Sequence, residues 1–210
     1  MTARLVYVMD PMCSWCWGFA PVLEALTSQA EAGGVGLHLV VGGLRSERSP
    51  MDAAGRERIQ SYWRAVEEAT GQRFDYQRGM PTGFVYDTEP ACRALVAARQ
   101  IDDAAVLPLA NAIQRAFYLQ GRDPVSTAEL VKLAEEAGLA RDAFAERFDS
   151  LEAAEQTRAD FAWAQNLGIA GFPTLLAERD GQFALLTNGY QPLERLSPLL
   201  SRWLEQGAHA

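Results

Sequence analysis

The chain has 210 residues, of which 49% are hydrophobic and 22% are charged, a composition typical of a folded globular protein and not of a disordered one. Its 27 acidic and 19 basic residues give a formal charge of -8. A surface with this charge repels phosphate backbones and anionic lipids, so neither nucleic acid nor a membrane is an expected partner. The first residues lack the apolar segment and cleavage site of a secretory signal, which predicts a cytoplasmic protein.

The first elements predicted along the chain form a strand, helix, strand unit. Residues 5–9 alternate β-branched and aromatic side chains and read as a buried strand that ends at Asp10-Pro11. Residues 15–32 carry apolar side chains at helical spacing, and Gly33-Gly34 ends that helix. Residues 35–41 are the second strand. This order predicts a parallel crossover unit, whose hand is almost always right-handed.

The middle of the chain is predicted to be mostly helical. A helix is expected over residues 49–71, and a long loop over residues 72–87. Residues 88–148 show helical spacing of apolar side chains throughout, interrupted by glycines. One helix in this block opens with the sequence STAE at residues 126–129, which is the pattern of a capping box.

The last part of the chain returns to strand character after a helix that ends at Gly168. Strands are predicted over residues 174–177 and 183–187, joined by a hairpin turn at Asp180-Gly181. Residues 192–205 form the final predicted helix. A crossover unit, a helical block and then helix, hairpin and helix fit a thioredoxin fold that is split by an all-helical insertion.

The strongest chemical signal is the motif CSWC at residues 13–16, directly after the first strand. A two-residue spacer brings both sulfurs within disulfide reach when the second cysteine lies in the first helical turn. The first cysteine then lies at the helix amino terminus, where unpaired N–H groups and the macrodipole favour thiolate over thiol. We therefore expect Cys13 to be the nucleophile, with a lowered pKa, and Cys16 to be the resolving thiol.

Two other interpretations of the cysteine pair are a structural zinc site and inert packing. A zinc site needs four ligands, and the other candidates are Cys92, His38 and His209, which the sequence places in a helix, a strand and the tail. No metal is therefore expected. Cys92 shares a helical face with apolar residues, so it is expected to be a buried structural thiol.

Two segments together resemble the DsbA-like family of predicted protein disulfide isomerases: DPMCSWCWGFAP at residues 10–21 and GFPT at residues 171–174. The resemblance spans nearly the whole chain. It implies an α/β thioredoxin fold interrupted by an all-helical insertion. Residues 1–87 and 151–210 would form the two thioredoxin-fold parts, and residues 88–150 the insertion.

The resemblance also implies roles for residues around the cysteine pair. Pro173 is expected to be cis and to face the pair, with Phe172 beside it. Trp15, Phe172, Pro173 and Thr174 are the expected substrate-binding residues, and no cofactor is expected. The side chains of Met12, Trp15, Trp17 and Phe172 would form an apolar rim for peptide segments. The helical insertion is expected to cover the site and to shape access to it.

The sequence departs from the general thioredoxin pattern in two places. Many thioredoxin-fold enzymes have a buried carboxylate where this chain has Tyr7. The nearest acids are Asp10 and Glu24, for which a loop residue and a helix-face charge are favoured over a proton relay to Cys16. The spacer also lacks the histidine of typical DsbA proteins, so a strongly oxidising potential is not expected.

These observations favour a thiol–disulfide oxidoreductase or isomerase that acts on protein or peptide disulfides and thiols, with a low-molecular-weight thiol as a candidate reductant. In a reducing compartment the pair is expected to rest as a dithiol, which favours reductase or isomerase action. One alternative is a glutathione-dependent small-molecule transferase or isomerase, resembling the kappa-class glutathione transferases and hydroxychromene-carboxylate isomerases. A second alternative is a noncatalytic binding module.

Overall fold

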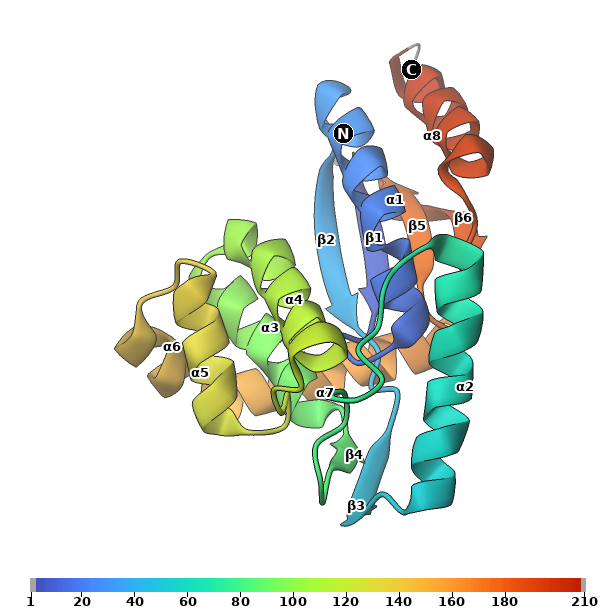
Figure 1. The fold of residues 1–210 in the computed structure, drawn as a ribbon. Coiled ribbons are helices and arrows are strands. Elements are labelled where there is room, and N and C mark those ends of the chain that lie inside the picture. The colour runs from blue at the N-terminus through green and yellow to red at the C-terminus, as the bar shows by residue number, and fades with distance from the viewer. Residues whose placement is uncertain (1–2, 209–210) are drawn as a thin grey trace.

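The computed structural model describes residues 3–208 and is organised around a mixed four-stranded sheet in the order β2-β1-β5-β6 (Figure 1). Its strands are β1 (Ala3–Met9), β2 (Gly36–Val41), β5 (Thr174–Arg179) and β6 (Gln182–Asn188). β1 pairs in parallel with β2, whereas β5 is antiparallel to both β1 and β6. The predicted strand, helix, strand unit and the predicted hairpin are therefore confirmed.

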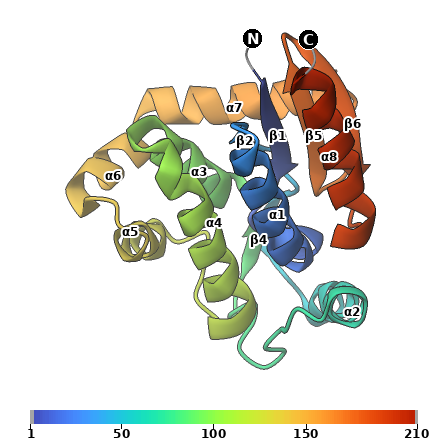
Figure 2. The same ribbon diagram turned by 90° about the horizontal axis from the view of Figure 1, so that it is seen from above.

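Helices cover both faces of this sheet and extend beyond one of its edges. The helices are α1 (Ser14–Ala32), α2 (Ala53–Thr70), α3 (Glu89–Ile101), α4 (Val106–Arg115), α5 (Thr127–Glu136), α6 (Arg141–Phe148), α7 (Leu151–Asn166) and α8 (Leu193–Ala208). A 3-10 turn η1 (Asp103–Ala105) precedes α4, and a π-helical segment η2 (Ala116–Gln120) follows it. Figure 2 shows α1 and α8 on one face of the sheet and α7 across the other, with α3 to α6 beside the β2 edge.

Successive side chains of β1 point to opposite faces of the sheet, and both sets are apolar, so both faces are covered. Leu5, Tyr7 and Met9 belong to the main core together with residues of α1 and α8. Val6 and Val8 point the other way and pack with apolar residues of β2, β5 and α7. A strand whose two faces are both buried carries apolar side chains at successive positions, as β1 does here.

The outer edge of β2 is closed by side chains instead of another strand. Arg99 of α3 donates to the Leu39 carbonyl and forms a bidentate ion pair with Asp160 of α7, at 2.9 and 3.0 Å. Asp160 in turn accepts a hydrogen bond from the Val41 backbone N–H. The pair satisfies backbone groups that an open edge would leave available for pairing with another chain, and it ties two helices to the sheet.

The turn between β5 and β6 has the conformation that its sequence predicts. Asp180 and Gly181 both have positive φ, 49° and 81°. Positive φ at both central residues is the requirement of a type I′ turn, the two-residue hairpin turn that matches the twist of the strands.

The region between β2 and α3 differs from the sequence prediction. The helix expected over residues 49–71 begins only at Ala53, after Asp52, whose side chain accepts from the Gly55 N–H at 2.7 Å. Residues before it form β3 (Ser46–Pro50), which pairs antiparallel with β4 (Val85–Asp87) in a small second sheet. The long loop expected over residues 72–87 thus ends in a strand. β3 is exposed along its whole length, so no apolar alternation marked it in the sequence.

The helical block contains the helices expected over residues 88–148, but one of its caps differs. Ser126 is the residue before α5, yet its side chain makes no capping hydrogen bond. Glu129 instead binds the guanidinium of Arg122, which also pairs with Glu136 at 2.9 Å. The Ser126 N–H donates to the Asp123 carbonyl at 3.3 Å, and the Glu129 N–H donates to the Ser126 carbonyl at 3.0 Å, so neither half of the reciprocal capping box forms.

Candidate active site

Cys13 lies at the junction between the loop after β1 and the amino end of α1. Its backbone is extended, with φ -84° and ψ 118°, and its carbonyl accepts from the N–H groups of Cys16 and Trp17 at 3.0 and 3.1 Å. Its own N–H donates to the Asp10 carbonyl at 3.0 Å. Cys13 is thus the residue directly before α1, at the end where the first N–H groups of a helix have no partner within the helix, and its side chain accepts no capping hydrogen bond.

Cys16 lies one turn further along α1 and is more deeply buried, 1% exposed against 6% for Cys13. Both are free thiols. Burial raises the pKa of the Cys16 thiol well above its ordinary value, and the adjacent Cys13 raises it further. Hydrogen bonds from the Asp10 backbone and the Tyr7 hydroxyl act in the opposite direction. The Cys16 thiol is therefore protonated at neutral pH in the resting protein.

The segment preceding β5 meets Cys13 from the other side. The Phe172-Pro173 peptide bond is cis, as expected, and the Phe172 carbonyl lies 3.7 Å from the Cys13 sulfur. The Pro173 carbonyl accepts from the Gly189 N–H at 2.7 Å, which ties this segment to the end of β6. Residues far apart in sequence therefore form one surface around the sulfur of Cys13.

Asp10 fixes the loop before Cys13 from inside the protein. It is fully buried, and its carboxylate accepts from the N–H groups of Met12 and Leu44, at 2.8 and 2.7 Å, and from the Cys92 thiol at 3.4 Å. Burial raises the pKa of Asp10, and these hydrogen bonds oppose the rise. The Asp10 carboxylate is thus hydrogen-bonded to its own loop, to the loop after β2 and to α3, which supports its interpretation as a loop residue. Glu24 is exposed on α1.

Cys92 is buried in α3, as expected for a structural thiol. It is 0% exposed, and burial raises its pKa well above the ordinary value, with the nearby Asp10 carboxylate adding to the rise. A thiol that is both inaccessible and protonated is a poor nucleophile. Its contact with Asp10 links the helical block to the loop of the cysteine pair.

Three buried tyrosines, Tyr7, Tyr86 and Tyr118, lie around the pair. The Tyr86 hydroxyl donates to the Met12 carbonyl at 2.6 Å, next to Cys13. Tyr118 stacks on Trp17 with ring centroids 6.0 Å apart. Tyr7 occupies the place of the missing carboxylate. Tyr86 belongs to β4 and Tyr118 to η2, both far from the cysteines in the sequence. Only the folded chain therefore brings these two residues to the site.

The apolar rim is smaller than the four residues predicted for it. Met12 is 0% exposed, and Trp17 is buried with its Nε1 donating to the Arg73 carbonyl at 3.0 Å, so both belong to the core. Trp15 and Phe172 are only partly buried. Tyr190 joins them, with its ring centroid 6.1 Å from that of Trp15. Tyr190 follows Gly189 directly after β6, and it is not among the residues that the sequence predicts for the rim.

Thr174 is a buried residue directly after Pro173. Its side chain is 1% exposed, and its hydroxyl bonds to the Gly171 carbonyl at 2.8 Å and to the Asn188 side chain at 3.1 Å. The hydroxyl is thus engaged within the protein. This geometry favours a role in holding the Gly171–Pro173 segment over direct contact between the Thr174 side chain and a substrate.

The helical block lies beside the amino end of α1, and its members differ in distance from the cysteine pair. α4 and η2 contact α1, most directly through the stacked rings of Tyr118 and Trp17. Figure 1 shows α5 and α6 on the outer side of α3 and α4, away from α1. Only α4 and η2 are therefore placed to influence access to Cys13.

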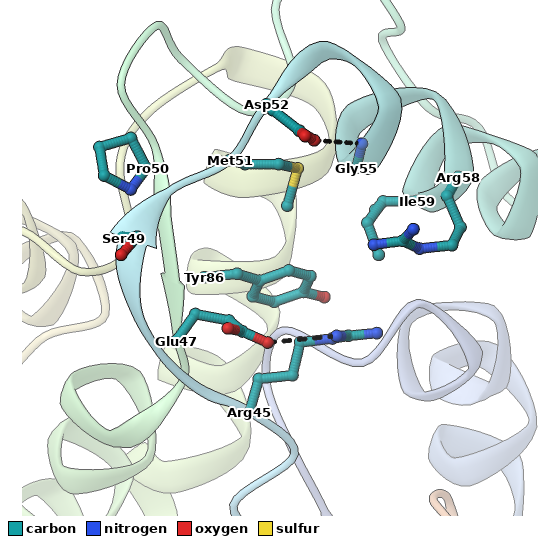
Figure 3. A pocket seen from close by; sticks show the side chains of 10 residues that line it. All are labelled: Arg45, Glu47, Ser49, Pro50, Met51, Asp52, Gly55, Arg58, Ile59 and Tyr86. Carbon is teal, nitrogen blue, oxygen red and sulfur yellow. Dashed lines mark hydrogen bonds and ion pairs between the residues drawn. The ribbon is translucent and has the colours of Figure 1, made fainter.

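A cavity of about 240 Å³ opens between β3, the amino end of α2 and Tyr86 (Figure 3). In Figure 3 the guanidinium groups of Arg45 and Arg58 both lie on the side of the Tyr86 ring that carries the hydroxyl. Arg45 lies over the Tyr86 ring at 5.0 Å and pairs loosely with Glu47 at 3.8 Å. Because the Tyr86 hydroxyl binds the residue before Cys13, this cavity adjoins the wall of the cysteine site.

Among residues 3–208 no group of three or more His, Cys, Asp or Glu side chains is arranged to hold a metal ion. His209 lies outside the residues that the structure describes. Within the same residues, no helix has both the length and the apolar character needed to span a bilayer.

Comparisons with known proteins agree with this geometry. A protein from Nitrosomonas europaea, provisionally assigned as a protein disulfide isomerase, is 40% identical with a TM-score of 0.91, and the match covers 98% of this chain and 99% of that one. The cytosolic disulfide reductase DsbM from Pseudomonas aeruginosa is 33% identical with a TM-score of 0.79, over 95% of this chain and 98% of that one. No curated protein matches the sequence.

Two further comparisons concern a more distant structure and a family model. A structure of 2-hydroxychromene-2-carboxylate isomerase shares the fold, at 15% identity and a TM-score of 0.68, over 98% of each chain. The family model of the DSBA-like thioredoxin domain matches residues 4–201. The fold is thus the expected thioredoxin fold of the DsbA-like kind. The chain belongs to the DSBA-like thioredoxin domain family of thiol–disulfide oxidoreductases.

Proposed function

We propose that this chain reduces or reshuffles protein disulfides through Cys13 and Cys16. The observation that carries the proposal is the placement of the Cys13 sulfur, at the amino end of α1 and 3.7 Å from the Phe172 carbonyl. The sulfur belongs to the residue directly before the helix, and it lies against the backbone of the segment that leads into β5. A nucleophile with a resolving thiol one turn away and a backbone edge beside it suits attack on a disulfide in an extended peptide.

The chemistry proceeds by two exchanges. The Cys13 thiolate attacks one sulfur of the substrate disulfide, so that the substrate S–S bond breaks and its other sulfur leaves as a thiolate. The Cys16 thiolate then attacks the Cys13 sulfur of this mixed disulfide and releases the second substrate thiolate. The substrate gains two electrons and two protons, and the Cys13–Cys16 pair loses the same number and becomes a disulfide. The reverse sequence oxidises a dithiol.

The reductive direction and a cytoplasmic location are part of this proposal. Support comes from DsbM, described as a cytosolic disulfide reductase, to which this chain is 33% identical. A second structure of DsbM contains glutathione, at 32% identity to this chain. We propose that a low-molecular-weight thiol of this kind returns the oxidised Cys13–Cys16 pair to the dithiol, because a reducing compartment supplies such thiols in excess.

Substrate contact is proposed at the rim formed by Trp15, Phe172 and Tyr190. The rings of Trp15 and Tyr190 have centroids 6.1 Å apart, the Phe172 carbonyl lies beside the Cys13 sulfur, and all three side chains are only partly buried. Aromatic side chains gain contact area with little loss of rotational freedom, which suits the binding of varied unfolded segments. Pro173 and Thr174 would hold the Phe172 backbone in place for a substrate strand.

The test is a trapping experiment with Cys16→Ala. Cys13 can still attack, but no thiol resolves the adduct, so stable mixed disulfides are expected to accumulate on non-reducing gels. Mass spectrometry of the adducts identifies the substrate class: captured proteins support the proposal. Cys13→Ala is the matched control, and it is expected to capture nothing and to lack turnover. A Cys13→Ala variant with normal dithiol activity would show that the nucleophile is assigned wrongly.

A second candidate is a glutathione-dependent transferase or isomerase acting on a small molecule. The observation favouring it is the cavity beside Tyr86, which has the size of a small ligand and is bordered by Arg45 and Arg58. Adducts of glutathione alone on Cys16→Ala would support this candidate over the protein reductase. A chain with no turnover of any disulfide would leave the noncatalytic binding module as the remaining interpretation.

A further inference from the structure

Tyr7 occupies a buried position directly behind the cysteine pair. It is the fifth of the seven residues of β1 and is 1% exposed. Because side chains alternate along a strand, Tyr7 points to the same face as Leu5 and Met9, which is the face that α1 covers. Its ring lies 6.0 Å from that of Phe19, one turn beyond Cys16 on the same helix.

The Tyr7 hydroxyl hydrogen-bonds the Cys16 sulfur, and the two side chains are equally buried. The other donor to this sulfur is the backbone of Asp10. No carboxylate takes part, because Asp10 directs its oxygens to Met12, Leu44 and Cys92 instead. Among the described side chains, Tyr7 is thus the one with an O–H group directed at the resolving thiol.

This hydroxyl acts as a donor and does not act as a base. Burial raises the pKa of Tyr7 well above its ordinary value, and the proximity of Cys16 raises it further. The phenol therefore keeps its proton throughout the physiological pH range. A neutral O–H group stabilises a neighbouring thiolate by a charge-assisted hydrogen bond, and it adds no charge to the protein interior.

Building on the proposed function, we infer that Tyr7 is a catalytic residue of the resolution step, donating its hydroxyl hydrogen bond to the Cys16 thiolate. When Cys16 loses its proton to solvent or to the departing substrate thiolate, this bond offsets part of the cost of a buried negative charge. Cys16 then attacks the Cys13 sulfur, the Cys13–substrate bond breaks, and the substrate sulfur leaves with the electron pair. Tyr7 keeps its proton throughout and, in the reverse direction, stabilises Cys16 as the leaving group.

The test separates the two exchanges with dithiobis-nitrobenzoate, whose thiolate is coloured. In single turnover, the attack of Cys13 releases one coloured thiolate and the attack of Cys16 releases the second. Tyr7→Phe is expected to leave the first phase within about twofold. A charge-assisted bond shifts the Cys16 pKa by about one to two units. Because a more basic thiolate is also more nucleophilic, the second phase is expected to slow only about three- to tenfold at neutral pH.

The pH profile provides a readout that a packing defect would not move. The profile of the second phase is expected to shift upward by about one unit or more in Tyr7→Phe. Tyr76→Phe is the matched control, since it also removes a tyrosine hydroxyl that is hydrogen-bonded, to the Glu67 carboxylate at 2.6 Å, and its ring packs on Trp63 and Phe74 instead of the cysteine pair. That variant is expected to keep the profile of the original chain.

A second measurement does not depend on turnover. In a Cys13→Ala background, the rate of Cys16 alkylation against pH, read by mass spectrometry of its peptide, is expected to shift upward when Tyr7→Phe is added. Unchanged profiles in both experiments would overturn the inference. A chain that releases no coloured thiolate at all would instead contradict the proposed function, so the two failures are distinguishable.

Discussion

The thiols of Cys13 and Cys16 have different surroundings although only two residues separate them. Cys13 lies before the first turn of α1, against the Phe172 carbonyl, whereas Cys16 faces the core and the Tyr7 hydroxyl. The difference in burial assigns the first attack to Cys13 and the second to Cys16. The same reasoning predicts that alkylating reagents modify Cys13 first, because both thiolate character and exposure govern cysteine reactivity.

Asp10 leads to a prediction on pH and stability at the residue scale. Its pKa in the folded protein is raised by burial above the ordinary 3.8. The folded state therefore holds this proton more tightly than the unfolded chain, and ionisation of Asp10 destabilises the fold. The penalty is absent below the unfolded pKa, grows as the pH rises through the interval between the two values, and is constant above the folded pKa.

Asp10→Asn removes this titration. The free energy of unfolding of the variant minus that of the original chain is expected to increase with pH across that interval and then to level off. Urea denaturation at a series of pH values from about 4 to 8 measures it. The variant also loses a hydrogen-bond acceptor, which adds a constant offset, so the slope is the decisive quantity. A difference that decreases with pH would contradict the raised pKa.

At the scale of elements, the β2 edge depends on two charged side chains from different helices. The Arg99 and Asp160 side chains are 11% and 7% exposed, and together they bind the backbone of β2. Removing one member would leave the other as a buried, unpaired charge, which costs far more than the pair itself contributes.

Arg99→Ala is accordingly expected to lower the free energy of unfolding by about 3–5 kcal/mol. The control is Arg147→Ala, which removes an ion pair of α6 and α7 whose side chains are 36% and 71% exposed. Exposed pairs contribute about 0–1 kcal/mol, so this control should change little. Urea unfolding of both variants measures the two changes in the free energy of unfolding. Equal decreases in the two variants would show that the buried ion pair of Arg99 stabilises the fold no more than an exposed one.

At the scale of the whole molecule, the site is built where segments from most of the chain converge. Figure 1 shows the amino end of α1 beside α2, α4 and the connection to β4, at the end of the sheet opposite the two chain ends. The loop after β2 and the segment before β5 meet there too. Gly42 in that loop packs against the Phe172 ring, and an added Cβ would lie 2.0 Å from it.

Gly42→Ala is therefore expected to displace Phe172 and, with it, the backbone that faces Cys13. We expect a loss of about 1–3 kcal/mol in unfolding free energy, typical of overpacking, together with a slower first phase in the coloured-disulfide assay. Gly36→Ala is the control, because a Cβ there would meet no atom within 4 Å. If both variants kept the original first-phase rate, the position of Phe172 would not matter for attack by Cys13.

The sequence by itself determined the elements that depend on local pattern. A short run of β-branched and aromatic residues indicated β1, glycines marked the ends of α1 and α7, and Asp180-Gly181 specified the hairpin turn. The cysteine spacing after a strand located the two thiols, and the GFPT segment located the backbone that faces them. These features are readable because each depends on residues within a few positions of one another.

Only the tertiary structure decided the interactions between distant residues. The polar strand β3 exists because β4 pairs with it, Glu129 binds the Arg122 guanidinium, and Met12 and Trp17 are covered by the core. The Tyr7 hydroxyl at Cys16 and the Cys92 thiol at Asp10 likewise require the fold to bring them together. A local pattern specifies which face a side chain occupies, but its partner across the core depends on packing, which no local pattern encodes.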